Sequence, residues 1–395
     1  MIIMNIGILT FHKPINYGAF LQAFSLSNKI KEIYPDSNIN IIDYFPPREK
    51  KNIKLNMLRS FKHHGFTGVM RCHYKNKAFQ KSYRYLMLSE KINAKYDMQR
   101  LFDYIESTYD VLIIGSDAIF NWNQTGFPTP FIPQRKLRIP VLFYAASVHG
   151  MKYLDEDKSK IDICKSAFIN SSYVGVRDNC SKNFVRYCSI DSNPIHCCDP
   201  TFFINAKQII KNAGNYKKRI KDKYGISLNE KYIVIMSPNN ALTNIITSTY
   251  KREYTIIHVF EGDNNDKCFL YDLTPFEWAE VLAHASAVIT RFFHGTLLSL
   301  IRGVPALVID YSNYDGKYES KLRDLMKTRL CLNELYYTIN DVNELVMKDK
   351  NSILSIFDQM LNGNYKNQII KSVAIERNSA HSFFDCLSKL IEDLQ

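Results

Sequence analysis

Residues 287–300 combine the side chains and backbone best suited to bind and transform an anion. An apolar run enters a loop that carries Arg291 and His294, and Gly295 and Thr296 then open a second apolar run with helical spacing. The first turn of a helix offers unpaired N–H groups and a partial positive charge to a phosphate or carboxylate. The histidine can also transfer a proton near neutral pH. We predict an anion site here, with a structural histidine bonded to local backbone as the alternative.

Two further strand ends carry residues suited to proton transfer and anion binding. Gly115 and Ser116 follow the apolar run 111–114 and lead to Asp117, whose carboxylate could accept a proton from a hydroxyl group. Its alternative role is that of a turn or helix cap. Arg177 follows another apolar run and has the planar fork that grips a carboxylate or phosphate. A surface ion pair is the alternative for this arginine.

The first polar loop of the chain, residues 12–19, is a candidate for ligand contact. It lacks the Gly-x-Gly-x-x-Gly fingerprint of dinucleotide binding, so we do not expect NAD there. Gly18 lets a ligand approach the backbone closely. Asn16 either contacts a ligand or caps the helix that follows. His12 and Tyr17 complete the candidate set in this loop.

Several other chemistries lack the residues that they need. The histidines are scattered without a His-x-x-x-His pair, and the nine cysteines form no Cys-x-x-Cys pair, so we predict no metal site. The Gly-x-Ser-x-Gly motif of hydrolases is also absent. Asp199, in the turn 198–201, is expected to be structural. We interpret the cysteines as reduced thiols of a cytoplasmic protein.

These candidates need strands and helices to position them, and the two patterns alternate along the chain. Buried strands are predicted at residues 6–10, 38–43, 111–114, 141–144, 173–176, 232–236, 254–259, 287–289 and 306–309. Helices are predicted at residues 19–33, 276–285 and 317–327, and one long amphipathic helix at about 370–391. Such alternation favours parallel sheets with helices on both faces.

The length of 395 residues allows two or three domains at about 150 residues each. We predict two doubly wound, Rossmann-like α/β domains, over residues 1–205 and 206–395, which face a central cleft. The apolar N-terminus lacks a basic region and a cleavage site, so it is interpreted as a strand rather than a signal peptide. No apolar run is long enough to span a membrane.

A basic, helical insertion is predicted at about residues 48–100, in the first domain. From Arg48 to Arg84, eleven Lys or Arg residues accompany the single acid Glu49, with aromatic residues interleaved. Such a segment could rest on an anionic membrane at its cytoplasmic face or attract an anionic substrate. A solvated helical face is the alternative. The net charge of +12 comes without a nucleic-acid-binding signature, so we expect no nucleic acid partner.

Six motifs occur in one order along the chain, and together they resemble the polysaccharide pyruvyl transferase family. They are residues 7–22, Gly115-Ser116-Asp117, residues 144–147, Val176-Arg177, residues 199–201 and residues 293–296. The resemblance implies a fold like that of GT-B glycosyltransferases. It also implies transfer of the enolpyruvyl skeleton of phosphoenolpyruvate to a sugar diol, which yields a cyclic pyruvate ketal and phosphate in surface polysaccharide synthesis. Phosphoenolpyruvate is then a co-substrate, and no cofactor is expected.

The resemblance also suggests roles for the candidate residues. Arg177, Arg291, and the helix start at Gly295 and Thr296 would hold phosphoenolpyruvate. His294 would act as the general acid or as a donor to the departing phosphate.

Asp117 would be the base for an acceptor hydroxyl, with Gly115, Ser116 and the loop 12–18 on the acceptor side. The acceptor would be a sugar, an oligosaccharide or a lipid-linked saccharide. Two positions depart from the family pattern: Phe292 stands where many members have a basic residue, and Ala118 stands where glutamine is frequent.

Two other functions are compatible with these residues. A GT-B glycosyltransferase with a nucleotide-sugar donor would share the two-domain cleft and the phosphate-binding helix. A non-catalytic binding protein that keeps the fold is the other alternative, although the presence of both Asp117 and His294 favours an enzyme.

Overall fold

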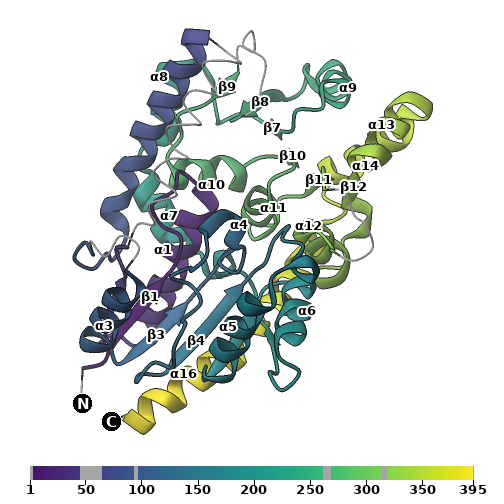
Figure 1. Ribbon diagram of the computed structural model, residues 1–395. Coiled ribbons are helices and arrows are strands. Elements are labelled where there is room, and N and C mark those ends of the chain that lie inside the picture. Colours follow the sequence, from purple (N-terminus) through teal and green to yellow (C-terminus); the bar gives the residue numbers. More distant parts are fainter. Residues whose placement is uncertain (1–2, 45–64, 93–96, 261–267, 313–317, 395) are drawn as a thin grey trace.

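The computed structural model describes residues 3–44, 65–92, 97–260, 268–312 and 318–394, and these residues form two α/β domains (Figure 1). Each domain is built on a six-stranded sheet in which all paired strands are parallel. Helices cover both faces of the sheets, so the predicted fold class is confirmed.

The first sheet has the strand order β2-β1-β3-β4-β5-β6. Its strands are β1 (Asn5–Leu9), β2 (Asn38–Ile41), β3 (Val111–Ile114), β4 (Val141–Ala146), β5 (Tyr173–Val176) and β6 (Ile195–His196). Its helices are α1 (Tyr17–Ile33), α3 (Met98–Thr108), α4 (Trp122–Thr125), α5 (Lys158–Ile169) and α6 (Asn179–Cys188).

Side chains of the first sheet alternate between two hydrophobic cores, as successive residues of a strand must. Val111 and Ile113 pack in the core that contains α1, whereas Leu112 and Ile114 pack in the core that contains α3, α5 and α6. A strand that is buried on both faces is apolar throughout. This is why such runs were recognisable in the sequence.

The second sheet has the strand order β12-β11-β10-β7-β8-β9. Its strands are β7 (Tyr232–Met236), β8 (Thr255–Val259), β9 (Phe269–Leu270), β10 (Ala287–Thr290), β11 (Ala306–Asp310) and β12 (Tyr336–Thr338). Its helices are α7 (Ala206–Ala213), α8 (Tyr216–Tyr224), α9 (Asn240–Tyr250), α10 (Pro275–Ala283), α11 (Phe293–Leu300), α12 (Lys321–Arg323), α13 (Ile339–Lys348) and α14 (Lys350–Leu361).

All nine predicted strands are present, and the prediction missed the short strands β6, β9 and β12, which lie toward sheet edges. The prediction of a single long C-terminal helix is wrong. Residues 366–394 instead form α15 (Lys366–Arg377), a 3₁₀ turn (Asn378–Ala380) and α16 (His381–Leu394). Ile370 of α15 is 52% exposed, whereas Phe383 of α16 is fully buried.

The last helix returns to the first domain, where it packs below the sheet (Figure 1). The ring of Phe383 lies 4.4 Å from that of Tyr144 and 5.6 Å from that of Tyr173, measured between centroids. The Tyr173 hydroxyl and the Ser382 hydroxyl share a hydrogen bond of 2.7 Å. This aromatic contact therefore anchors the C-terminal end of the chain to β4 and β5.

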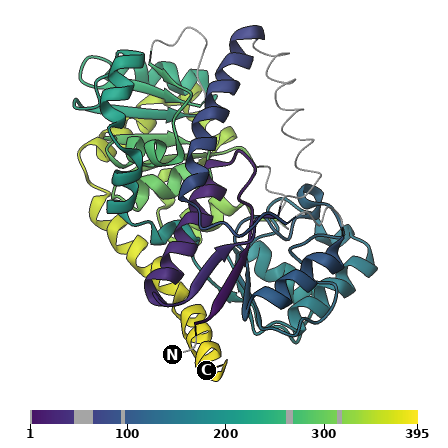
Figure 2. The same ribbon diagram turned by 90° about the vertical axis from the view of Figure 1, so that its left-hand side faces the viewer.

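Part of the predicted basic insertion lies outside the described residues, which resume at residue 65. Residues 65–80 form a helix that continues into a 3₁₀ turn (Lys81–Tyr85). Figure 2 shows this blue helix alongside the second domain. The segment therefore connects to the first domain in sequence but packs on the second in space.

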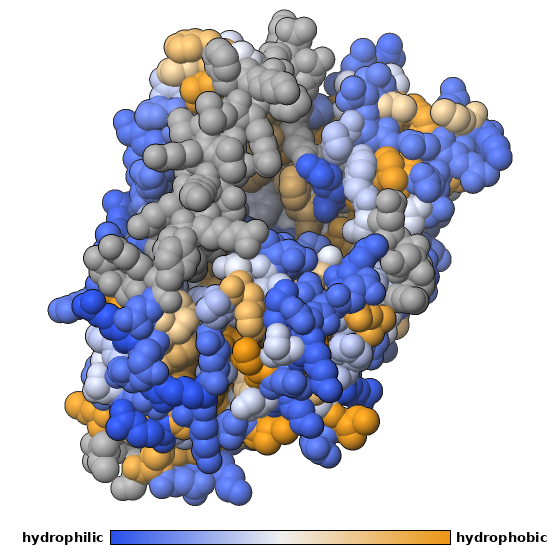
Figure 3. Space-filling view, in the orientation of Figure 1, coloured by the Kyte–Doolittle hydropathy of each residue, from blue (hydrophilic) through white to orange (hydrophobic). Residues whose placement is uncertain are grey.

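No helix in the described ranges has the length and apolar character needed to cross a membrane. The face of the molecule drawn in Figure 3 is mostly hydrophilic, with scattered hydrophobic residues, and it is hollowed between the two domains.

The anchor of α16 leads to a stability prediction. Replacing Phe383 with alanine leaves a cavity beside Tyr144, so we expect Phe383→Ala to lower the free energy of unfolding by about 3–5 kcal/mol in urea denaturation. Leu394→Ala, in the same helix at a side chain 43% exposed, should change it by less than about 0.5 kcal/mol. Equal effects of the two substitutions would contradict the anchoring role.

Candidate functional site

Charged side chains from both domains meet at the carboxyl ends of the strands. Asp117 follows β3, Arg177 follows β5, and His294 lies in the first turn of α11 in the second domain. Asp199 precedes a 3₁₀ turn (Pro200–Phe203), and Lys321 is the first residue of α12. We call these five residues the charged centre. It brings together three of the predicted site residues: Asp117, Arg177 and His294.

Arg177 lies at the middle of the charged centre and is 4% exposed. Its Nη1 donates to Asp199 Oδ2 at 2.9 Å, and its Nη2 lies 3.7 Å from Asp117 Oδ1. The guanidinium also lies 4.7 Å from the centre of the Phe293 ring. Within the described part of the chain, Nε and Nη2 are buried without a hydrogen-bond partner. Because buried donors without partners are costly, this edge of the guanidinium is suited to an anion.

Asp199 joins the separate parts of the centre. Its Oδ2 accepts hydrogen bonds from Gln22 of α1 and from Arg177, and lies 3.6 Å from His294 Nε2. Its Oδ1 accepts from the backbone N–H of Thr201 at 2.9 Å. Burial favours the neutral acid, but His294 and Arg177 outweigh it and hold the pKa of Asp199 well below its usual value. The predicted turn role is present, together with an ion pair that the sequence did not indicate.

Asp117 is positioned by an unusual backbone conformation. Its φ of 81° lies in the left-handed region, which aspartate tolerates better than most residues. Its carbonyl accepts from the N–H of Ser147 at 2.9 Å, which ties the turn to β4. Burial raises the pKa of Asp117, but Arg177 and Lys321 more than offset this and leave the pKa below the ordinary value. Asp117 is therefore a carboxylate at neutral pH and can accept a proton.

Lys321 belongs to the centre but was not a candidate in the sequence. Its Nζ lies 5.2 Å from the centre of the Phe293 ring, and it lines a narrow cavity with Arg177, Asp199 and Asp324. In the described ranges no carboxylate oxygen lies within 4 Å of Nζ. Burial and the nearby Arg177 lower the pKa of Lys321 to about 8. Nothing in the local sequence marks this lysine, because its surroundings come from distant parts of the chain in both domains.

His149 is a second residue that sequence analysis missed. Lys321, burial and Arg177 together lower the pKa of His149 to about 3, so its imidazole is neutral at physiological pH. Its backbone carbonyl accepts from Asn121 Nδ2 at 2.7 Å. Lys321 and Arg177 therefore influence a histidine that lies outside the charged centre.

Gly18 allows another group to approach the backbone closely, and in the structure this group is the imidazole of His294. A Cβ atom added to Gly18 would lie 1.9 Å from His294 Nδ1, so no side chain fits between the loop and the imidazole. The other His294 nitrogen, Nε2, is buried and has no hydrogen-bond partner in the described part of the chain. The backbone at Gly18 therefore packs against the Nδ1 edge of the imidazole, and Nε2 points toward Asp199 in the charged centre.

The other predicted residues of the first loop make structural contacts. The nitrogens of His12 lie 3.2 Å from Asp43 Oδ1 and 3.1 Å from the Thr10 carbonyl oxygen. Asn16 caps α1, with its side-chain oxygen accepting from the N–H of Ala19 at 3.1 Å.

Tyr17 links the two domains, because its hydroxyl donates to the carbonyl of Leu273 and its ring packs on Trp278.

Gly115 and Ser116 shape the turn before Asp117. Gly115 has a φ of 143°, and an added Cβ would lie 2.0 Å from the carbonyl oxygen of Tyr144. The hydroxyl of Ser116 is buried without a partner among the described residues. Glycine is therefore required for close packing of the turn, and Ser116 keeps a hydroxyl available.

The remaining predicted residues lie on the second-domain side. Arg291 is exposed, and its guanidinium lies over the rings of Phe292 and Tyr311 at 5.1 and 5.7 Å. The hydroxyl of Thr296 donates to the Phe292 carbonyl at 3.1 Å. Gly295 packs tightly against β7 and β10, where an added Cβ would approach Met236 Cε to 2.8 Å. Arg291 is thus placed beside Tyr311 rather than against Arg177.

Solved structures with the same architecture belong to sugar-nucleotide enzymes. The UDP-GlcNAc 2-epimerase of Neisseria meningitidis, bound to UDP-GlcNAc, is similar over 98% of this chain and 99% of its own, with a TM-score of 0.56 and 9% identity. The UDP-GlcNAc 2-epimerase of Methanocaldococcus jannaschii is similar over 96% of this chain and 100% of its own, with a TM-score of 0.51 and 13% identity. At such identities the likeness shows the fold alone, and it confirms the predicted GT-B-like arrangement.

Sequence comparison identifies the family. No curated protein sequence matches this chain with significance. The sequence pattern of the polysaccharide pyruvyl transferase family matches residues 16–313, well over half of the chain. This range includes Asp117, Arg177, Asp199 and His294, and it ends before Lys321. The chain therefore belongs to the polysaccharide pyruvyl transferase family, which implies an enzyme with a saccharide acceptor.

Proposed function

We propose that this enzyme transfers the enolpyruvyl skeleton of phosphoenolpyruvate to two hydroxyls of a sugar, in the synthesis of surface polysaccharide. The product is a cyclic pyruvate ketal, and inorganic phosphate leaves. Family membership supports the class of reaction. The observation that carries the choice of donor is the buried Arg177 guanidinium, whose Nε and Nη2 have no hydrogen-bond partner among the described residues, in a cavity that Lys321 also lines.

The side chains of Arg177 and Lys321 together suit a small molecule that carries a carboxylate and a phosphate. The open edge of Arg177 presents Nε and Nη2 in the parallel arrangement that binds two oxygens of one anion. Lys321 adds a compact charge that can reach a second anionic group. The Phe293 ring contacts both cations, at 4.7 Å from the Arg177 guanidinium and 5.2 Å from Lys321 Nζ, measured to the ring centre.

The proposed reaction has two steps. First, one sugar hydroxyl adds to C2 of phosphoenolpyruvate while C3 gains a proton and becomes a methyl group. Second, the other hydroxyl attacks C2 and the C–O bond to phosphate breaks. Of the two protons that the hydroxyls lose, one balances the methyl group and the other leaves with phosphate.

The proton carriers in this proposal are Asp117 and His294. Asp117 is held as a carboxylate and can take a proton from an acceptor hydroxyl. His294 Nε2 is unpaired and faces Asp199 at 3.6 Å, so Asp199 can balance the charge of a protonated imidazole. Such an imidazole can donate to C3 or to the departing phosphate. The hydroxyl of Ser116 is available to the acceptor.

The donor can be tested directly. We expect the purified protein to release phosphate from phosphoenolpyruvate only when a suitable sugar acceptor from a panel is present. Mass spectrometry should show the acceptor heavier by one pyruvate minus one water. Release of UDP or GDP from a nucleotide sugar, without consumption of phosphoenolpyruvate, would instead identify a glycosyltransferase.

The role of the histidine gives a second prediction. Because a positioned acid contributes a factor of about 10²–10⁴, His294→Ala should lower kcat by that factor. The matched control is His284→Ala, which removes a histidine at the end of α10 that is paired with Glu280. Near-normal turnover of His294→Ala would exclude the acid role.

The pKa of Lys321 gives a prediction about pH. The ammonium group is charged below its pKa of about 8 and loses its charge as the pH rises through that value. The KM for phosphoenolpyruvate should therefore rise above about pH 8, and Lys321→Arg should remove this rise because arginine stays charged.

The control for this experiment is Lys327→Met. Lys327 follows in the same segment, where its Nζ lies over the ring of Tyr336. This variant should keep the wild-type pH profile, whereas Lys321→Met should have a high KM at every pH. An unchanged profile in Lys321→Arg would contradict the assignment.

A further inference from the structure

The basic segment, defined here as residues 65–85, directs its cations toward the second domain. The guanidinium of Arg71 lies 4.9 Å from the centre of the Phe269 ring. The Nζ of Lys75 lies 4.3 Å from the centre of the Phe260 ring. Figures 1 and 2 agree that this helix runs beside α8 and β9. Arg71 and Lys75 are therefore turned toward the second domain, whereas Lys77, Lys81 and Arg84 are exposed.

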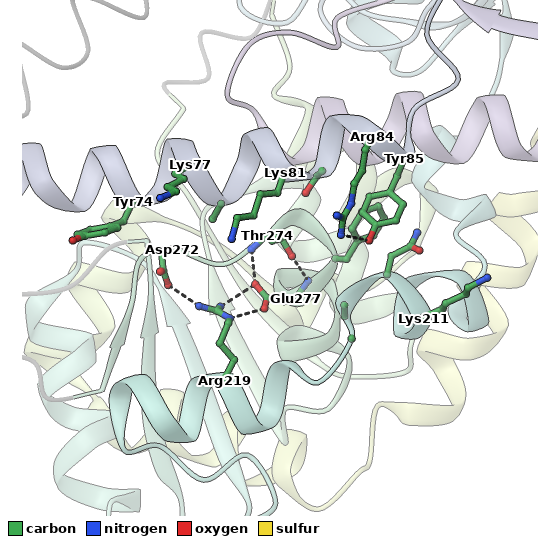
Figure 4. A pocket seen from close by; sticks show the side chains of 16 residues that line it. Tyr74, Lys77, Lys81, Arg84, Tyr85, Lys211, Arg219, Asp272, Thr274 and Glu277 are labelled. Carbon is green, nitrogen blue, oxygen red and sulfur yellow. Dashed lines mark hydrogen bonds and ion pairs between the residues drawn. The ribbon is translucent and has the colours of Figure 1, made fainter.

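A cavity of about 460 Å³ lies between the basic segment and the second domain (Figure 4). We call it the basic pocket. Of the described residues that line it, five are cationic and two are acidic: Lys77, Lys81, Arg84, Lys211, Arg219, Asp272 and Glu277. In Figure 4 the two acids and Arg219 form one wall, and the basic segment forms the other.

The acids of the basic pocket are already paired. Glu277 accepts from Arg219 Nε and Nη2 at 2.6 and 2.9 Å, and from the N–H of Thr274 at 2.7 Å. Asp272 accepts from Arg219 Nη1 at 3.1 Å and also from Lys223 and Tyr224. Arg219 and Lys223 together balance the charges of the two acids, so neither acid remains to neutralise the cations of the opposite wall.

The other cations keep their charge uncompensated. In the described ranges, no carboxylate oxygen lies within 4 Å of the side-chain nitrogens of Lys77, Lys81 or Lys211. Arg84 lies over the Tyr85 ring at 4.8 Å and donates to the Tyr85 hydroxyl. Like charges gathered around one cavity repel each other, so a bound anion would stabilise this arrangement.

We propose that the basic pocket binds a diphosphate ester. Lysines at 77 and 81 are one helical turn apart and present two compact charges to the same space, as a phosphate pair requires. The rings of Tyr74 and Tyr85 also line the cavity, and they offer apolar surface on which a sugar or base can pack. A sugar diphosphate and a nucleoside diphosphate share this chemistry.

The basic pocket is separate from the charged centre. Phe276 lines the pocket and is fully buried, with its ring 5.5 Å from that of Phe20 and 5.1 Å from that of Phe24 in α1. This aromatic layer lies between the pocket and the loop that backs His294. The inference therefore does not depend on the proposed pyruvyl transfer.

The experiment is a calorimetric titration of the full chain with inorganic pyrophosphate, uridine diphosphate and glucose 1-phosphate. We expect the double variant Lys77→Glu and Lys81→Glu to weaken pyrophosphate binding at least about tenfold. Lys77→Gln with Lys81→Gln should act in the same direction without adding repulsion. The matched control, Lys350→Glu with Lys371→Glu, makes the same change in net charge on α14 and α15 and should bind as the wild type does.

The outcomes are distinct. Absence of binding, or equal affinity in the wild type and both Lys77 and Lys81 double variants, would overturn the proposal, because pyrophosphate would then bind nowhere or only at the charged centre. Equal loss in the control would overturn it too, since net charge alone would explain binding. Tighter binding of uridine diphosphate than of pyrophosphate would support the pocket and assign the ester to a nucleotide. Tighter binding of glucose 1-phosphate than of pyrophosphate would overturn the proposal, because a single phosphate would then suffice.

Discussion

The burial of one guanidinium between two domains is the constraint on which the site depends. An arginine cannot lose its charge, so Arg177 is tolerated at 4% exposure only because Asp199 and Asp117 lie beside it. These carboxylates compensate the charge but leave Nε and Nη2 without a hydrogen bond among the described residues. This edge of the guanidinium is thus able to bind an anion. The buried donors without hydrogen bonds lower the stability of the fold, and the surrounding packing must offset this cost.

Asp199 holds residues from distant parts of the chain in fixed positions relative to one another. It is contacted by α1 through Gln22, by the end of β5 through Arg177, and by α11 through His294. Gly18 of the same helix α1 lies against the other edge of the His294 ring. The histidine is therefore confined between a backbone and a carboxylate. Its position depends on how the two domains meet, because α1 and α11 belong to different sheets.

How much of the structure can be predicted from the sequence depends on how far apart in the chain the interacting residues lie. Strands such as 111–114 and 232–236 are buried on both faces, so each is visible as a local apolar run. Residues at strand ends, such as Asp117 and Arg177, could be found for the same reason. Short strands such as Phe269–Leu270 offer too few residues for a pattern. Lys321 and the basic pocket arise only from contacts between elements far apart in the chain, which no local pattern reports.

The charge of the centre bears on how the proposed donor would bind. Asp117 and Asp199 are carboxylates at neutral pH, and they balance the charges of Arg177 and Lys321 before any ligand arrives. An incoming anion would give the centre a net negative charge, which favours the uptake of a proton together with the anion. The unpaired Nε2 of His294, 3.6 Å from Asp199, is the atom in the described centre best placed to accept that proton. Binding of phosphoenolpyruvate would then itself place the proton on the residue that the proposed reaction uses as an acid.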